Sequence, residues 1–197
     1  MLTMPAVAPT FGDVRLRAFE PRDAGMVQDL STEPYVPLIG SLVENATAEQ
    51  AIEWIERQHN RLATGAGYSF CIADIDDDRA LGQAGLWLAA IAQGRATAGY
   101  SVAPAARGRG VGAQALTALT SFAWGVPELH RVELYIEPWN VASARTAEAA
   151  GYQHEGLLRS QQVIGGRRVD MMIYSALRPD SSANDCCAEA RCLLSDS

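Results

Sequence analysis

The sequence predicts one α/β domain, in which a mixed β-sheet of about seven strands carries helices on both faces. The chain has 197 residues, the length of a single domain, and 48% of them are hydrophobic, enough to fill a core. The expected elements follow the order β-α-α-β-β-β-α-β-α-β-β, which is typical of an α/β sandwich. The clearest strand, at 131–137, alternates apolar and polar side chains between two helical segments.

The N-terminal segment predicts an arm, a strand and a short helix. Residues 1–12 show no periodic pattern, and we expect them to form a loose arm. Residues 14–18 alternate in the way that a strand does. Pro21 suits the first position of a helix, which should run to about Leu30.

A longer helix is expected after an irregular loop. Pro34 and Pro37 should keep the chain irregular, because proline lacks a backbone donor. Residues 47–50 read Thr-Ala-Glu-Gln, which is a capping box, and apolar residues follow at helical spacing. Gly65 should end this helix, since glycine readily adopts the left-handed backbone found at helix ends.

The middle of the chain predicts an antiparallel meander of three strands. These strands cover 68–74, 80–90 and 95–102. The acidic run 74–78 lies between the first two, and we expect it to be a solvated hairpin turn.

The C-terminal half predicts alternating strands and helices. A glycine-rich loop leads into a helix at 111–124, and the strand at 131–137 follows. A second helix at 140–150 precedes two strands, at 152–163 and 167–175, which a Gly-Gly turn joins.

The expected domain covers residues 13–178, and residues 179–197 form a tail that we expect to be mobile. Three of the four cysteines lie in this tail, without the C-x-x-C spacing or the nearby His of a zinc site. We therefore expect a reduced, cytoplasmic protein with no metal. The N-terminus lacks the charged start of a signal peptide, and the charge-free stretch 110–127 is too polar for a membrane span. We expect no membrane partner.

The charge composition excludes several classes of function. The chain has 16 basic and 23 acidic residues and a formal net charge of −7, which argues against a nucleic-acid partner bound by a broad basic surface. Every basic residue is Arg, so the sequence has neither a Walker-type lysine nor a lysine that could form a Schiff base. An Ala-rich chain without Lys also suggests a GC-rich bacterial genome.

The segment 104–112 predicts an anion-binding loop between a strand and a helix. Its glycines allow a tight turn, and consecutive N–H groups before a helix form a cradle that the helix dipole makes positive. Arg107 and Arg109 add local positive charge. The expected ligand is a pyrophosphate, although the spacing fits neither G-x-G-x-x-G nor the Walker pattern. A purely structural turn is the alternative.

Arg107-x-x-Gly110-x-Gly112 resembles the R/Q-x-x-G-x-G/A motif of the GCN5-related N-acetyltransferases. The resemblance implies that the loop binds the pyrophosphate of acetyl-CoA, a co-substrate. It also implies that 98–102 is a bulged strand whose backbone pairs with pantetheine. The cofactor-binding residues that the resemblance implies are Tyr100, Ser101, Val102, Arg107, Gly108, Arg109, Gly110, Val111, Gly112, Asn140 and Ser143.

Later motifs resemble one branch of that family. Residues 140–143, 150–152 and 155–156 follow its N-x-x-S…GF…EG pattern in order, and 169–175 resemble its last strand. This branch contains the ribosomal-protein N-terminal alanine and serine acetyltransferases. The resemblance spans roughly 14–178.

Ser143 is the candidate acid for the thiolate that leaves the thioester. Direct attack by an amine requires an oxyanion donor, a base for the amine and an acid for the thiolate. The backbone N–H groups near Ser101 and Val102 are the oxyanion donors that the resemblance implies. Ser143 lies in the first turn of a helix opened by Asn140, where the dipole favours a thiolate. Ordinary capping is the alternative, and Asn140 can both cap the helix and contact the cofactor.

The general base is the least defined part of the predicted site. Many relatives place a Glu on the fourth strand, where this chain reads Ala96-Thr97-Ala98, and some place an acid where it has Gln162. The remaining carboxylates are Glu137, Glu155 and Glu133, for which surface or hydrogen-bonding roles are favoured. The candidate catalytic residues are thus Ser143, Asn140, Glu137 and Glu155. A water relay, or an amine that arrives neutral, would need no dedicated base.

Two tryptophans have different expected roles. Trp87 reads as a core residue. Trp139, in a Pro-Trp-Asn turn, either walls the acceptor site or packs over a helix N-terminus. The loop 31–46 should help to shape the acceptor pocket, but it carries no readable motif.

The predicted function is transfer of the acetyl group of acetyl-CoA to a primary amine, by direct attack. The branch favours an N-terminal α-amine of a protein or peptide, in a protein that is a monomer or a homodimer. One alternative is an enzyme that acetylates a small amine, such as an antibiotic or a metabolite. The other is a CoA-binding module without catalysis, because the acids of the fourth strand are missing.

Overall fold

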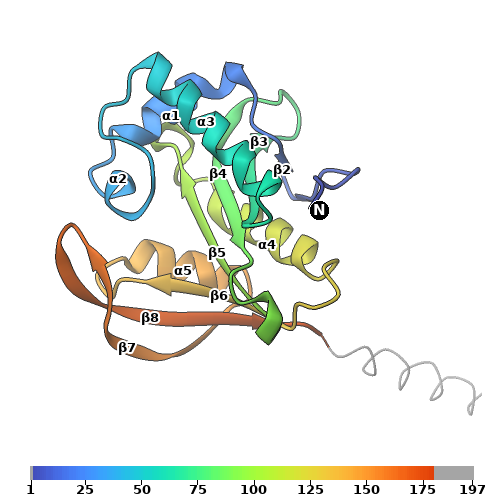
Figure 1. Cartoon of the computed structure of the whole chain (residues 1–197), viewed down its shortest axis with the longest axis vertical. Helices are drawn as coiled ribbons and strands as arrows, with labels where there is room; N and C mark the ends of the chain where they lie inside the picture. The colour runs from blue at the N-terminus through green and yellow to red at the C-terminus, as the bar shows by residue number, and fades with distance from the viewer. Residues whose placement is uncertain (1, 180–197) are drawn as a thin grey trace, which may run out of the picture.

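One mixed β-sheet of eight strands organises residues 2–179, the part of the chain that the computed structural model describes (Figure 1). The predicted tail, apart from residue 179, lies outside these residues. The strands are β1 (Thr10–Phe11), β2 (Val14–Arg17), β3 (Gly67–Asp74), β4 (Ala80–Trp87), β5 (Arg95–Val102), β6 (Arg131–Ile136), β7 (Gln153–Ile164) and β8 (Arg167–Leu177).

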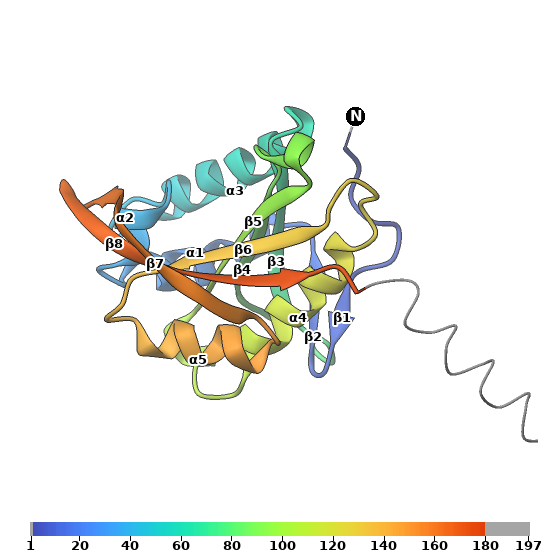
Figure 2. The ribbon, with the colours of Figure 1, turned by 90° about the horizontal axis from the view of Figure 1, so that it is seen from below.

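The strand order is β1-β2-β3-β4-β5-β6-β8-β7, and only β5 and β6 are parallel neighbours within the described chain. Helices cover both faces, with α3 above the sheet and α4 and α5 below it in Figure 2. The predicted fold class is therefore confirmed. The helices are α1 (Ala24–Ser31), α2 (Val36–Ile39), α3 (Ala48–Ala63), α4 (Val111–Ala123) and α5 (Val141–Ala149).

Most expected boundaries lie within two residues of the observed ones, and three segments differ more clearly. The arm contains β1, because the chain turns at Gly12 and pairs Thr10 with Arg15 of β2. The expected loop after α1 contains the short helix α2, because Pro37 lies in its first turn, where no backbone donor is required. Strand β4 ends at Trp87 rather than at residue 90.

The capping box predicted at the start of α3 is present. The Thr47 hydroxyl accepts the Gln50 backbone N–H at 3.3 Å, and the Gln50 side-chain oxygen accepts the Thr47 N–H at 2.9 Å. Gly65 follows the helix with φ +74°, as predicted for a helix end. These local bonds fix where α3 begins and ends, and so which of its side chains face the sheet.

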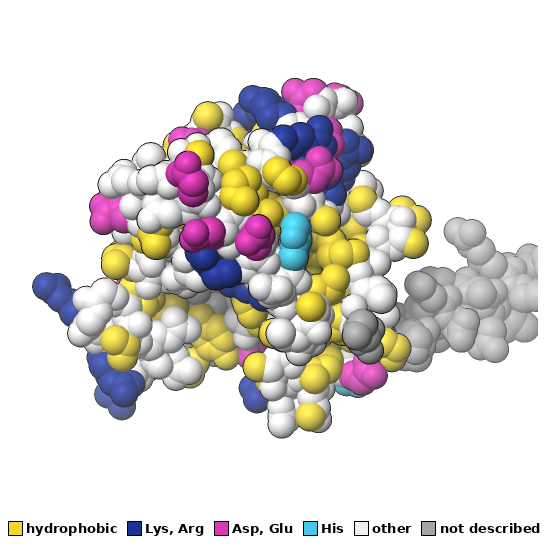
Figure 3. Space-filling view, turned by 45° about the horizontal axis from the view of Figure 1, so that its top comes forward, with side chains coloured by type: hydrophobic (Ala, Val, Ile, Leu, Met, Phe, Trp, Pro, Cys, Tyr) yellow, Lys and Arg dark blue, Asp and Glu magenta, His cyan; other side chains and the backbone are white. Residues whose placement is uncertain are grey.

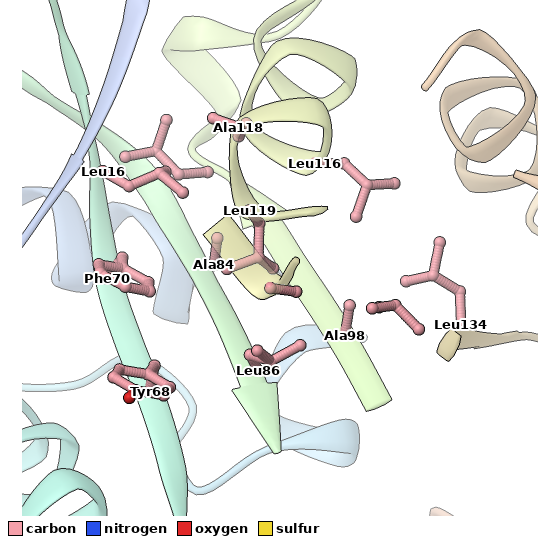
Figure 4. Packing of buried hydrophobic residues seen from close by; sticks show 14 of the residues in the cluster. Leu16, Tyr68, Phe70, Ala84, Leu86, Ala98, Leu116, Ala118, Leu119 and Leu134 are labelled. Carbon is pink, nitrogen blue, oxygen red and sulfur yellow. The ribbon is translucent and has the colours of Figure 1, made fainter. Parts of the chain in front are cut away.

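The main core lies between the sheet and α4. In Figure 4 the side chains of Leu16, Phe70 and Leu86 point from the strands toward Leu116 and Leu119 of the helix. All five are fully buried. Helix α4 is thus a buried core helix, as its charge-free sequence predicted, and it anchors the loop that precedes it.

Strands β5 and β6 pair only at their beginnings. Arg95, Ala96 and Thr97 pair with residues 131–133, and the two strands part beyond Thr97. Strand β5 stays on β4 through Val102, while β6 stays on β8. The β4–β5 ladder has no register shift, so the bulge expected in 98–102 is absent from it. The parting leaves an open edge on β5.

The acidic turn is more than the solvated hairpin that its sequence suggested. Asp78 forms ion pairs at 2.8 Å with both Arg15 and Arg17, and a third pair with Arg22. Its side chain is only 22% exposed. Desolvation raises its pKa, but the hydrogen bonds and charges of these arginines outweigh that effect and bring the pKa to about 2.

Replacing Asp78 with Asn should therefore lower stability at pH 7 by about 1–2 kcal/mol. The folded-state pKa is depressed, so this contribution is complete above the unfolded pKa and is lost as the pH falls from about 4 to about 2. Urea unfolding of both proteins at pH 7 and pH 2.5 measures the difference. Asp77→Asn, which removes an exposed pair with Arg79, is the control. An equal Asp78→Asn effect at both pH values would contradict the ion-pair explanation.

Candidate functional site

The loop before α4 presents a run of free backbone donors. Gly108 and Gly110 both have φ +75°, and Gly110 is the N-cap of α4 without any side-chain cap. Among the described residues, none accepts a hydrogen bond from the backbone N–H groups of 108–113. Six such amides at a helix N-terminus fit a diphosphate, because both the donors and the helix dipole favour an anion.

The two arginines of the loop are already engaged. Arg107 pairs with Glu33 at 2.8 Å and donates from Nε to the Val102 carbonyl at 3.0 Å. Arg109 lies 3.8 Å from Asp74. The local charge that the sequence predicted for these arginines is therefore partly balanced by carboxylates, and the backbone amides are the main donors of this loop.

Tyr100 connects the loop to α5. A Cβ on Gly112 would lie 3.0 Å from the Tyr100 ring and 3.2 Å from Thr146, so only glycine fits there without movement. The Tyr100 hydroxyl donates a hydrogen bond to the Ser143 Oγ at 3.3 Å. The Tyr100 ring thereby places the first turn of α5 beside the first turn of α4.

A cavity of about 620 Å³ opens where β5 and β6 part. Residues 97–101 and 134–137 form its strand walls, and residues 35–42, around α2, border it. Figure 3 shows hydrophobic side chains inside the hollow that separates the lobe at the lower left from the rest of the molecule. The volume is that of a typical small-ligand site. The predicted residues Tyr100, Ser101, Glu137, Asn140 and Ser143 all line this one cavity.

Helix capping in α5 belongs to Asn140 rather than to the Ser143 hydroxyl. The Asn140 side-chain oxygen accepts the Ser143 backbone N–H at 3.1 Å. The Ser143 hydroxyl oxygen accepts from Tyr100 instead. Because Ser143 is the acceptor in that bond, its own proton is free to be donated into the cavity.

Glu137 is a buried carboxylate on the cavity wall. It lies just beyond the end of β6, and only 7% of its surface is exposed. The Tyr35 hydroxyl is its neighbour: burial, followed by a hydrogen bond and by the charge of Glu137, raises the pKa of the Tyr35 phenol. Within the described chain, no arginine forms an ion pair with Glu137, so its charge is not neutralised there.

The other candidate carboxylates lie elsewhere. Glu155 forms an ion pair with Arg131 and accepts a hydrogen bond from Ser175; Arg131, then Ser175, lower its pKa to about 2. Glu133 is also held by Arg131, at 2.7 Å. Neither lines the cavity. The structure therefore does not support Glu155 as a catalytic candidate, whereas Gln162 does line the cavity but cannot accept a proton.

Three cavity residues had no signal in the sequence: Tyr35, Arg61 and Trp87. Tyr35 comes from the loop without a motif, and Trp87 reads as core. Trp139 is 61% exposed and packs edge-on against Tyr35, with ring centroids 4.9 Å apart, so it reaches the site through that tyrosine.

Residues 2–179 lack two features, a metal-binding cluster and a membrane-spanning helix. No group of three or more His, Cys, Asp or Glu side chains there could hold a metal ion. No helix in that range is long and apolar enough to cross a membrane.

Comparison with known sequences identifies a family. The model of the acetyltransferase (GNAT) domain matches residues 13–153. The chain is 26% identical over 163 residues to the uncharacterized N-acetyltransferase p20 of Bacillus licheniformis, covering 83% of this chain and 92% of that protein. It is 31% identical over 135 residues to the probable N-acetyltransferase YjcK of Bacillus subtilis (strain 168), covering 68% of this chain and 75% of that protein.

Solved structures share the fold. A putative ribosomal-protein-serine acetyltransferase from Vibrio cholerae superposes with a TM-score of 0.75 at 20% identity, covering 89% of this chain and 100% of that one. Mycobacterium smegmatis RimJ in complex with CoA-disulfide gives a TM-score of 0.74 at 21% identity, covering 96% and 98%.

The residues matched by the family model run from β2 to the start of β7. They include the amide loop, the parted strands and the first turn of α5, the parts of the fold that build the site. The chain therefore belongs to the GNAT family and is an acetyl-CoA-dependent N-acetyltransferase.

Proposed function

We propose that this enzyme acetylates the N-terminal α-amine of a protein or peptide by direct attack on acetyl-CoA. The observation that carries the proposal is one cavity with a buried carboxylate, Glu137, and a free hydroxyl proton, that of Ser143, on its walls. The first group can take a proton from an amine, and the second can give one to a thiolate.

The chain's own residues fit the co-substrate. Acetyl-CoA supplies the acetyl group as a thioester. The amides of 108–113 would hold its pyrophosphate. The open edge of β5 offers backbone groups that could pair with its pantetheine portion. The backbone N–H groups near Ser101 and Val102 would stabilise the oxyanion. The Asn140 side-chain oxygen keeps its hydrogen bond from the Ser143 backbone N–H, so Asn140 caps α5.

The proton transfers balance across the cavity. Glu137 takes the proton of the amine, whose nitrogen forms the new bond to the acetyl carbon as the carbon–sulfur bond breaks. Ser143 donates its proton to the departing thiolate and takes the proton of the Tyr100 hydroxyl, which is hydrogen-bonded to it. The proton held by Glu137 returns to Tyr100 through solvent as the products leave. An α-amine suits this arrangement, because its pKa of about 8 leaves a useful neutral fraction near neutral pH.

The cavity mouth supports a peptide acceptor. Tyr35 and the exposed Trp139 form an aromatic border that can pack along a chain entering from solvent. The fold is also that of the Vibrio cholerae protein, described as a putative ribosomal-protein-serine acetyltransferase.

The test is acetyl-CoA turnover with short peptides of varied first residue, beside a panel of small amines. Release of free thiol with peptides, and none with the same peptides already N-acetylated, is the expected result. Turnover of small amines but of no peptide would show that the acceptor is a small amine rather than a peptide N-terminus. Binding of CoA without turnover of any amine would indicate a binding module.

Gly110→Val should weaken acetyl-CoA binding by about tenfold or more. Gly110 has φ +75°, a backbone that a β-branched residue strongly disfavours, so the amide cradle should lose its shape. Of the residues that the structure describes, only Gln114, at 3.8 Å, is near a Cβ there, so crowding is not the cause. Calorimetry measures the affinity, and Gly65→Val, which imposes the same strain far from the loop, is the control. Unchanged affinity in Gly110→Val would place the pyrophosphate elsewhere.

A further inference from the structure

Arg61 is a cation on the wall of the cavity. It lies in the last turn of α3 and is half-buried. Its guanidinium carbon lies 5.3 Å from the centroid of the Trp87 ring, and its Nη1 donates to the Ser69 hydroxyl at 3.2 Å. A cation over an indole face is attracted by the ring, which holds the guanidinium in place.

Two glycines allow the Trp87 ring to lie on the sheet. Gly85 and Gly99 are directly paired on β4 and β5. A Cβ on either would approach the Trp87 ring to 3.0 Å or 2.9 Å. The indole therefore rests on bare backbone, and the guanidinium of Arg61 lies above it on the same face of the sheet. Three elements thus cooperate to present one cation.

The guanidinium of Arg61 lacks a charge partner. No carboxylate of residues 2–179 forms an ion pair with it, and Ser69 is its one hydrogen-bond acceptor there. Burial lowers the pKa of the Arg61 guanidinium, which is the sign of a cation whose desolvation is not offset. A guanidinium has five N–H donors, so most of them are free for an anion. Among residues 2–179, Glu137 is the only other charged side chain on the cavity wall.

We propose that Arg61 binds a carboxylate of the acceptor, so that the preferred substrate carries both an amine, which Glu137 faces, and a carboxylate, which Arg61 holds. This inference rests on the proposed function, and it names the acceptor class more narrowly. Arg61 would act as a specificity residue, and Glu137 as the group facing the amine.

The sheet register gives a rough spacing between the backbone positions that carry the two charges, Gly99 beneath Arg61 and Glu137 itself. The ring beneath Arg61 covers Gly99, which lies two residues beyond Thr97. Thr97 pairs with Glu133, and Glu137 lies four residues beyond it. The offset along the strands is then two residues, or roughly 7 Å, and the lateral strand spacing adds at least roughly 5 Å. A separation on the order of 10 Å results.

Two sources of carboxylate match that spacing. In an extended peptide each residue adds roughly 3.3 Å, so an acidic side chain at the third residue would reach Arg61 while the α-amine faces Glu137. The free C-terminus of a tripeptide lies at a similar distance. The chemistry is the same in both cases, and paired peptides separate them.

The test compares kcat/KM for two peptide pairs. The first pair is a C-terminally amidated hexapeptide with Asp or Asn at its third residue. The second is a neutral tripeptide with a free or an amidated C-terminus. The wild-type enzyme should prefer the carboxylate member of at least one pair by about 10- to 100-fold, the usual range for a hydrogen bond to a charged group.

Variants test whether Arg61 causes the preference for the carboxylate peptide. Arg61→Gln should remove it by slowing only the carboxylate peptide, and Arg61→Lys should keep part of it, because the charge remains without the planar fork. Arg159→Gln, at an exposed position of β7 away from the cavity wall, removes the same charge and should keep the full preference.

Each failure points to a different conclusion. Equal turnover of both members of both pairs by the wild type would overturn the role of Arg61 while leaving α-amine acetylation intact. A preference that survives in Arg61→Gln would overturn it too. Turnover of no peptide at all would overturn the proposed function and this inference together.

Discussion

Glu137→Gln should lower kcat for acetyl transfer by about 10²- to 10³-fold at pH 7, which is within the usual contribution of a positioned general base. Glutamine keeps the size of the side chain and its contact with Tyr35, but it cannot accept a proton. The KM for acetyl-CoA should change little, because the amide loop lies outside the cavity wall that carries Glu137.

The pH profile adds a signature that a structural role would not produce. In Glu137→Gln the acceptor must arrive neutral, so the loss should shrink as the pH rises through the pKa of the α-amine, at about 8. Glu56→Gln, an exposed change on α3, is the control. If Glu137→Gln keeps most of its activity while folded and bound to CoA, a water relay performs the deprotonation instead.

Ser143→Ala should lower kcat by about 10- to 100-fold with little change in the KM for acetyl-CoA. The hydroxyl acts mainly in the transition state, when negative charge develops on sulfur. A thiolate beside a helix N-terminus is already a fair leaving group, so the lower part of the usual acid contribution is expected. Rapid-quench or steady-state kinetics on the purified variant measure the loss.

The structure separates this catalytic effect from helix capping. The α5 cap is the bond from the Ser143 backbone N–H to Asn140, and Ser143→Ala leaves it intact. Stability should therefore fall less in Ser143→Ala, which loses only the bond from Tyr100, than in Asn140→Ala, which should cost about 1 kcal/mol. A loss of stability in Ser143→Ala without a fall in kcat would show that Ser143 has a structural role and no catalytic one.

Local patterns in the sequence predicted most of the fold. The capping box of α3, the glycine loop before α4 and the alternation at 131–136 are all signals read within a few residues. Their physics is local, because caps, left-handed glycines and strand faces depend on near neighbours in the chain. The loop's position before α4 followed for the same reason.

The cavity could not be read in this way, because it is assembled from distant segments. Glu137 became a strong candidate only when its burial and its place beside Tyr35 were known, 102 positions apart in the chain. Trp87 was assigned to the core, although its ring lines the cavity over two glycines. Pro37 was read as a helix breaker, yet it occupies the tolerated first turn of α2.

The sheet consists of two halves, β1–β5 and β6–β8, which are joined only by the short pairing of β5 with β6. Only three residue pairs link β1–β5 to β6–β8 through the ladder. Backbone amides on the inner edge of β5 beyond Thr97 lack a neighbouring strand, so they exchange with solvent without any unfolding of the sheet. A ligand that contacts the parted edges of both β5 and β6 should slow that exchange by mass action. Substrate occupancy and the rigidity of the central sheet are therefore thermodynamically linked in this enzyme.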